Sequence, residues 1–198
     1  MEYKMNLYKK AIVVSREAHE SIGQKRKYSG EPYYFHPLAV AELVSQVTED
    51  EEILAAACLH DVLEDVTPLN PRYDAAFIEK EFGSEVLGLV LELTNEYEKI
   101  KYPSLNRKER KRLEHERLSK VSDGAKLIKR ADLHHNSTEM PSDDGFTKKW
   151  LDEKKDLEEK IGSWWDDKVP GSLCGKHIEE WGNMVLKIFR GDKNVESD

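Results

Sequence analysis

The spacing of apolar residues constrains the fold of this chain more than any other feature. Apolar side chains recur at intervals close to 3.6 residues almost throughout, and no segment alternates as a half-buried strand would. The segment from Asn6 to Ile22, for example, places Leu7, Ala11, Val14 and Ala18 on one helical face. The pattern therefore predicts an all-α protein, built as a compact helical bundle.

Composition narrows the class of protein. The 198 residues carry a formal net charge of −8, which argues against a nucleic-acid partner, because such proteins usually show a basic excess. No apolar run approaches the roughly 20 residues that span a bilayer, and the N-terminus lacks the pattern of a signal peptide. Only Cys58 and Cys174 are present, and Cys58 lies within an apolar run. We expect a cytoplasmic protein without a membrane partner; the sequence leaves the oligomeric state open.

The third predicted helix, from Glu49 to Val66, poses the sharpest physical problem. We expect Thr48 to cap it, with Glu51 completing a capping box. Its body, Ile53–Leu59 (ILAAACL), should be buried, yet the polar residues His60, Asp61, Glu64 and Asp65 follow directly. In a continuous α-helix, His60 and Glu64 share one face and Asp61 and Asp65 share another. Buried carboxylates need partners, and a divalent cation is one solution.

Two further residues complete a predicted metal site. His36 stands at the head of the preceding helix, where Pro37 suits the first turn, and Asp132 lies in a later apolar helix. Together with His60 and Asp61 they provide two imidazoles and two carboxylates. This donor set suits manganese, iron or zinc better than magnesium or calcium. Such a centre has open positions for water and a phosphate oxygen, which indicates metal-assisted hydrolysis.

Three ordered motifs carry a resemblance to a known family. They are HPLAVA (His36–Ala41), LHDVLED (Leu59–Asp65) and KRAD-x-x-x-N (Lys129–Asn136). Together with the upstream run between Ala18 and Tyr33, they resemble the HD hydrolase domain of RelA/SpoT proteins. The chain is similar in size to the small stand-alone (p)ppGpp hydrolases of the Mesh1 type. The likeness covers about 8–161, so we expect an HD phosphohydrolase domain over 1–161 and a helical C-terminal extension over 162–198 that packs on it and ends in a frayed tail.

The resemblance implies a role for each matching residue. It implies one divalent metal, usually Mn²⁺, and a ppGpp-like nucleotide whose 3′-pyrophosphate is hydrolysed to GDP or GTP and pyrophosphate. The family commonly reads A-D-R/K-L-x-N in its last motif, but Leu133 and His134 replace the basic-apolar pair here. The implied metal ligands are His36, His60, Asp61 and Asp132; the implied water-activating pair is Glu64 and Asp65; the implied substrate contacts are Arg26, Lys27 and Asn136.

Other interpretations remain open at this stage. The departure at Leu133 and His134 leaves room for another nucleotide substrate, such as (p)ppApp, NADPH or a deoxynucleotide. A non-catalytic alarmone binder is a third hypothesis, although such a protein has no need of Glu64 and Asp65. The basic run Arg107–Arg112 indicates a charged helix face rather than a nucleic-acid patch, because acidic residues are interleaved with it. His19, His134 and His135 are interpreted as structural.

Overall fold

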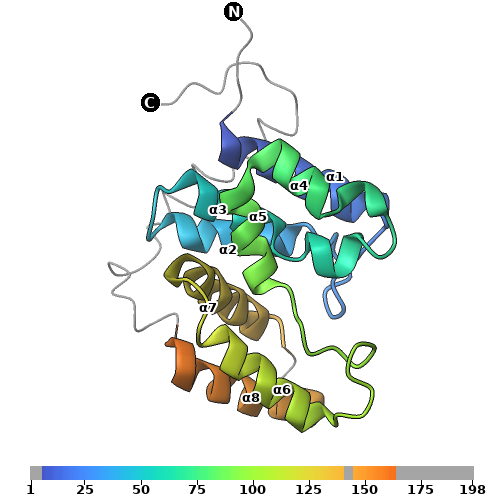
Figure 1. Ribbon diagram of the computed structural model, residues 1–198, viewed down its shortest axis with the longest axis vertical. Coiled ribbons are helices and arrows are strands. Elements are labelled where there is room, and N and C mark those ends of the chain that lie inside the picture. Colours follow the sequence, from blue (N-terminus) through green and yellow to red (C-terminus); the bar gives the residue numbers. More distant parts are fainter. Residues whose placement is uncertain (1–5, 141–144, 164–198) are drawn as a thin grey trace, which may run out of the picture.

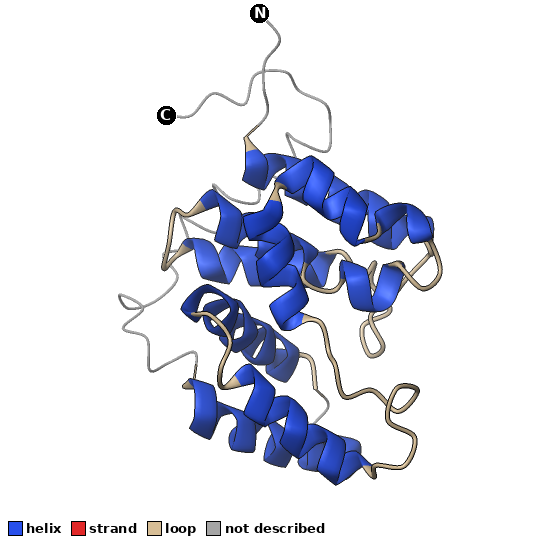
Figure 2. Ribbon diagram, viewed as in Figure 1, coloured by secondary structure: helices blue, strands red, loops and turns tan. Residues whose placement is uncertain are grey.

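Every regular element is helical in the computed structural model, which describes residues 6–140 and 145–163 (Figure 2). Within these ranges the isolated bridge between Lys25 and Pro32 is the one β-type pairing. A π-helical turn, η1 (Val62–Val66), and a 3₁₀ turn, η2 (Pro71–Tyr73), separate α3 from α4. The all-α prediction is confirmed. The α-helices are α1 (Leu7–Ser21), α2 (Phe35–Ser45), α3 (Glu51–Leu59), α4 (Ala75–Phe82), α5 (Ser84–Leu93), α6 (Arg107–Leu118), α7 (Asp123–Thr138) and α8 (Gly145–Ile161).

Helix α3 lies at the centre of the bundle because its body is apolar on every side. Residues 55–59 are fully buried, and the helix packs against α1, α2, α5 and α7. In Figure 1, α1 to α5 form the upper part of the molecule and α6 and α8 the lower part, with α7 between them. Helix α7 contacts helices on both sides, so it connects the two parts. The centre of the molecule is therefore where α2, the end of α3 and α7 meet.

The N-terminus of α3 differs from the prediction. The cap is Asp50, whose carboxylate accepts hydrogen bonds from the backbone N–H groups of Glu52 and Ile53. Thr48 instead accepts from the N–H of Asp50. The expected capping box does not form, because Glu51 Oε2 accepts from the N–H of Leu7 at the start of α1. Glu51 therefore ties two helices together.

The long helix predicted from Glu49 to Val66 is also wrong in its second half. The α-helix ends at Leu59, and the chain continues through His60 and Asp61 into the π turn η1, where Thr67 N–H donates to the carbonyl of Val62. The wider turn changes which side chains share a face. The expectation that His60 and Glu64 share one face, and Asp61 and Asp65 another, therefore does not apply. It also places the polar residues at an irregular joint, and such turns are frequent at functional sites.

Two glycines stand where another residue would be strained or crowded. Gly83 has φ +91°, a conformation that residues with a side chain rarely adopt, and it separates α4 from α5 as the cap residue of α5. At Gly124 in the first turn of α7, an added Cβ would lie 3.3 Å from both Ile53 and Leu89. That contact brings α7 close to α3 and α5. Helix α7 begins at Asp123, with Ser122 as its cap.

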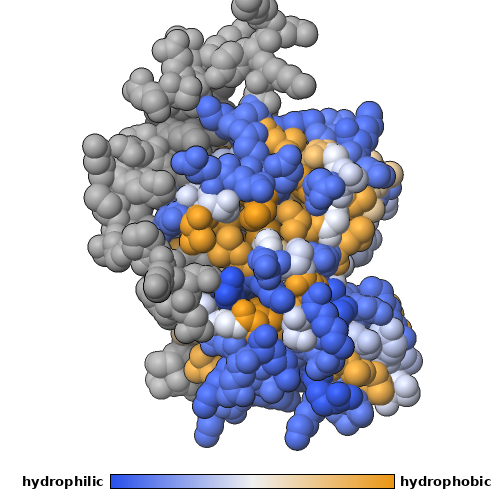
Figure 3. Space-filling view, turned by 60° about the vertical axis from the view of Figure 1, so that its left-hand side comes forward, coloured by the Kyte–Doolittle hydropathy of each residue, from blue (hydrophilic) through white to orange (hydrophobic). Residues whose placement is uncertain are grey.

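The described surface is mainly polar. On the face in Figure 3, hydrophilic residues cover most of the lower part, formed by α6 and α8, and an apolar area lies higher up. None of the described helices is both long and apolar enough to cross a membrane. The domain boundary at 161 stays a prediction, because the expected extension falls, from 164 to 198, outside the described residues.

Candidate metal centre

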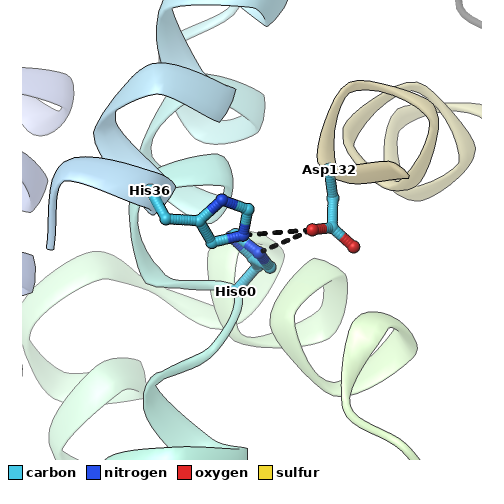
Figure 4. Close-up of side chains that lie close together, drawn as sticks. All are labelled: His36, His60 and Asp132. Carbon is cyan, nitrogen blue, oxygen red and sulfur yellow. Dashed lines mark ion pairs between the residues drawn. The ribbon is translucent and has the colours of Figure 1, made fainter. Parts of the chain in front are cut away.

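His36, His60 and Asp132 converge from three elements on one buried point (Figure 4). Their ligand atoms lie within 4.8 Å of one another, and His36 and His60 are almost inaccessible to solvent. Asp132 Oδ1 is 3.1 Å from His36 Nε2 and 3.9 Å from His60 Nε2. The close-up shows both imidazoles turned toward the carboxylate of α7. Three of the four predicted ligands are therefore brought together.

Asp61, the fourth predicted ligand, lies at the edge of this cluster. Its Oδ2 is 3.3 Å from His60 Nε2 and 3.7 Å from His36 Nε2. The same oxygen accepts a hydrogen bond of 2.8 Å from the hydroxyl of Tyr33. Burial acts to raise the pKa of Asp61, but His60 and His36 outweigh it and hold this pKa below its usual range. Asp61 is thus an ionised acid beside two imidazoles.

The protonation of His60 suits a metal ligand. Its Nδ1 lies 2.8 Å from the carbonyl of Ala57, which can only accept, so Nδ1 carries the proton. With Nδ1 as the donor, Nε2 is the ring nitrogen that faces the site and can offer a lone pair to a cation, and this buried atom has no hydrogen-bond partner among the described residues. A divalent cation would satisfy this lone pair and the carboxylates together. The residues present therefore fit a divalent metal.

A second set of residues holds the ligands in place. His135 Nδ1 lies 2.9 Å from His36 Nδ1, on the side of the ring away from the site. Asp132 accepts from Lys129 Nζ at 2.7 Å through Oδ2 and from Asn136 Nδ2 at 2.6 Å through Oδ1. Burial would raise the pKa of Asp132, yet Lys129 and His36 hold it well below its usual range. Such partners fix the orientation of metal-binding side chains.

Glu64 and Asp65 lie on η1 and are held differently. Both oxygens of Glu64 accept from Asn95, through its side-chain amide at 2.7 and 2.9 Å and its backbone N–H at 3.2 Å. Asp65 Oδ2 accepts one hydrogen bond of 2.7 Å, from Gln24 Nε2. Burial, together with the charge of Asp61, raises the pKa of Asp65 to about 6. A carboxylate with this pKa suits the role of a proton acceptor near neutral pH.

Arg26 and Asn136, two of the three predicted substrate contacts, are connected to the centre by hydrogen bonds. Arg26 donates to Glu139 Oε2 at 2.6 Å and to Asn136 Oδ1 at 3.0 Å, and its side chain is only 10% exposed. Asn136 thus connects Arg26 to Asp132. The ammonium group of Lys27 lies over the rings of Tyr28 and Phe146. Their role in substrate binding stays a prediction.

Two cavities adjoin the centre. One, of about 120 Å³, lies between α6, α7 and α8 and is lined by Asp132, Leu133 and Asn136 among others. The second, of about 180 Å³, lies beside Glu64 and Asn95 and is lined by basic residues of α6 and the preceding loop. Lys111 lines both cavities, and burial together with the charge of Lys129 lowers its pKa. The cationic lining of the second cavity consists of Lys99, Arg107, Arg110 and Lys111.

The sequence analysis missed several residues of this site. His135 was interpreted as structural, yet it contacts the candidate ligand His36. His19 contacts Gln24 at the start of the loop, which agrees with its structural interpretation. Tyr33 and Gln24 stand within the run that carries the resemblance, but nothing in their spacing indicates their partners. Asn95 follows α5 and meets Glu64 across 31 positions of sequence. Contacts between distant segments, such as that of Asn95 with Glu64, can be identified only in the folded structure.

The comparisons with known proteins agree with this geometry. The model of the HD domain matches residues 11–141. The chain belongs to the HD-domain family. It is 39% identical over 170 residues to the guanosine-3′,5′-bis(diphosphate) 3′-pyrophosphohydrolase MESH1 of Drosophila melanogaster, an alignment that covers 83% of this chain and 82% of the fly protein.

Two other proteins extend the comparison. The bifunctional (p)ppGpp synthase/hydrolase SpoT of Escherichia coli K12 is 37% identical over 142 residues, which cover 71% of this chain but 19% of SpoT. A solved structure of a metazoan ortholog of SpoT, described as hydrolysing ppGpp, matches with a TM-score of 0.65 and 27% identity. That match covers 98% of this chain and 99% of the solved one.

Proposed function

We propose that this protein hydrolyses the 3′-pyrophosphate of (p)ppGpp to GDP or GTP and pyrophosphate, with Mn²⁺ as its metal. The observation that carries the proposal is the buried cluster of His36, His60 and Asp132 with Glu64 and Asp65 on the adjoining turn. The likeness to the fly hydrolase, over most of both chains, supports this substrate. The buried free thiol of Cys58 fits a reducing, cytoplasmic location.

The residues have separable roles in this reaction. His36, His60, Asp61 and Asp132 would hold the metal, which when bound supplies positive charge against the phosphate oxygens. Asp65 accepts a proton from the attacking water, whose oxygen forms a bond to phosphorus as the bond between phosphorus and the 3′ oxygen breaks. The 3′ oxygen then takes up a proton and leaves as a hydroxyl. Glu64, fixed by Asn95, orients the water; Arg26, Lys27 and Asn136 contact the nucleotide.

The test is hydrolysis of ppGpp by the purified chain with added Mn²⁺, followed by chromatography of the products. We expect Mn²⁺-dependent release of GDP and pyrophosphate. Asp61→Ala should lose metal and turnover together, whereas Glu64→Ala should retain metal and lose turnover. A folded, metal-loaded protein that leaves ppGpp intact would refute the proposed substrate, and full activity in Glu64→Ala would refute the assigned role.

A second candidate substrate is another nucleotide, and one observation favours it. Leu133, which departs from the family's basic residue, is buried and lines the cavity beside Asp132 and Asn136. A panel of ppGpp, (p)ppApp, NADPH and deoxynucleotides separates these cases, because all would use the same metal centre. Nucleotide that binds but is never turned over would instead indicate a non-catalytic binder.

A further inference from the structure

A chain of hydrogen bonds connects a buried histidine of α1 to Asp65. His19 Nδ1 lies 2.6 Å from Gln24 Oε1, and Gln24 Nε2 lies 2.7 Å from Asp65 Oδ2. His19 is completely buried. The backbone of Gln24 is fixed as well, because its N–H donates to the carbonyl of His19 and its carbonyl accepts from Tyr33 N–H. The amide therefore stands in a fixed place between the two side chains.

The direction of this chain follows from what each group can donate. An ionised Asp65 can only accept, so the nitrogen of the Gln24 amide must face it. The amide oxygen then faces His19, whose Nδ1 must carry the ring proton. Burial lowers the pKa of His19 despite the hydrogen bond to Gln24, so the ring is neutral. Its Nε2 is consequently unprotonated, which agrees with the absence of a hydrogen bond to this buried atom from any described residue.

The same segment also supplies a donor to Asp61. The Tyr33 hydroxyl donates to Asp61 Oδ2 at 2.8 Å, and the rings of His19 and Tyr33 lie 5.0 Å apart. Asp61 and Asp65 thus each accept one hydrogen bond from an uncharged side chain of the segment 24–33. One oxygen of Asp65 is occupied in this way, and Oδ1 makes no hydrogen bond to a described residue. Asp65 Oδ1 therefore stays available to accept a proton.

We propose that His19 and Gln24 are positioning residues for Asp65: the Nδ1–H of His19 fixes the Gln24 amide so that its nitrogen holds Asp65 Oδ2 and leaves Oδ1 to accept the proton of water. This inference rests on the proposed hydrolytic function. Neither residue contacts the reacting atoms. His19 acts only through Gln24, so its effect exists only where Gln24 is present.

The kinetic test uses a double-mutant cycle on the full chain with Mn²⁺ and ppGpp. Gln24→Leu should lower kcat by about 10- to 100-fold, the range seen when supporting hydrogen bonds to site residues are lost. KM and the Mn²⁺ affinity from calorimetry should stay unchanged. His19→Phe should also lower kcat, but the double variant should be no slower than Gln24→Leu alone. His19→Asn, which restores an N–H donor, should recover activity.

Controls separate positioning from packing. Ser15→Ala alters another fully buried polar residue of α1 and should leave kcat unchanged. Costs of His19→Phe and Gln24→Leu that multiply in the double variant would overturn the proposal. So would a loss of Mn²⁺ affinity in Gln24→Leu as large as its loss of kcat, because that result would indicate general damage to the centre.

A measurement independent of turnover tests the direction of the hydrogen bonds from His19 through Gln24 to Asp65. In the metal-free protein, the ring ¹⁵N shifts of His19, assigned through their absence in His19→Phe, should show the Nδ1–H tautomer. Gln24→Leu should remove that preference. An Nε2–H tautomer in the unmodified chain would overturn the proposal. If the unmodified chain fails to hydrolyse ppGpp, the proposed function is refuted, while the nitrogen shifts still decide the order of this chain.

Discussion

His36 is oriented by another histidine rather than by the carboxylate or carbonyl that usually supports a metal ligand. Burial and the proximity of His36 lower the pKa of His135 to about 4, so the His135 ring is neutral near neutral pH, and its Nδ1 shares a hydrogen bond with Nδ1 of His36. We expect His135→Phe to weaken Mn²⁺ binding by about 10- to 100-fold, as measured by calorimetry. His115→Phe, which removes another buried histidine, on α6, should leave Mn²⁺ affinity unchanged.

Asp65 makes the pH dependence of turnover predictable. Its pKa is raised to about 6 by burial and by the charge of Asp61. A proton acceptor works only when ionised, so kcat/KM should be constant above this pKa and fall about tenfold per pH unit below it. Metal occupancy, followed by calorimetry at each pH, separates this effect from loss of Mn²⁺. A profile that stays flat down to pH 4.5 at full occupancy would contradict the assignment.

At the scale of single residues, the candidate metal ligands could be predicted from the sequence more readily than the residues that orient the site. His36, His60 and Asp132 stand out because charged and ligating residues interrupt apolar helices, where burial without a partner is costly. His19 and His135 also stand in helices, but a single buried histidine has the same pattern whether it packs or orients a site. Their roles depend on Gln24 and His36, which reach them only through the folded chain.

At the scale of elements, the cap of α3 offers a direct comparison. Asp50 accepts two backbone hydrogen bonds at the helix start, whereas Thr48 accepts one outside it. Asp50→Ala should therefore lower the free energy of unfolding by about 1 kcal/mol, the usual cost of losing a cap. Thr48→Ala should cost less. Urea unfolding of both variants measures the difference, and equal costs would contradict the assignment of Asp50 as the cap.

The helices were predictable from periodicity, but the joint after α3 was not. Apolar residues continue through Val62 and Val66, so the pattern favours one unbroken helix. At the break, Asn95 donates to Glu64 and Gln24 donates to Asp65, contacts that an unbroken helix predicted from spacing does not include. Because these partners lie far away in sequence, they cannot be predicted from the local spacing of apolar residues.

At the scale of the whole molecule, the candidate metal centre draws its residues from separate elements of the fold. His36 belongs to α2, His60 follows α3 and Asp132 belongs to α7. Helix α8 lies beyond the matched range of the HD domain, yet it packs against α6 and α7. Metal bound to the folded state alone adds about 2.7 kcal/mol at a concentration 100 times its Kd. We expect this gain in thermal scans of the unmodified chain, and no gain in Asp61→Ala.

The wide separation of the ligands along the chain has a consequence for the order of events in folding. His36 and its support His135 are 99 positions apart, so the centre exists only after α7 has docked on α2. If the folding transition state precedes this docking, the candidate ligands are not yet assembled in it, and it cannot bind the ion. Saturating Mn²⁺ should therefore slow unfolding by about 100-fold while leaving the refolding rate almost unchanged. Stopped-flow measurements in denaturant test this, and faster refolding would place the docking of α7 early.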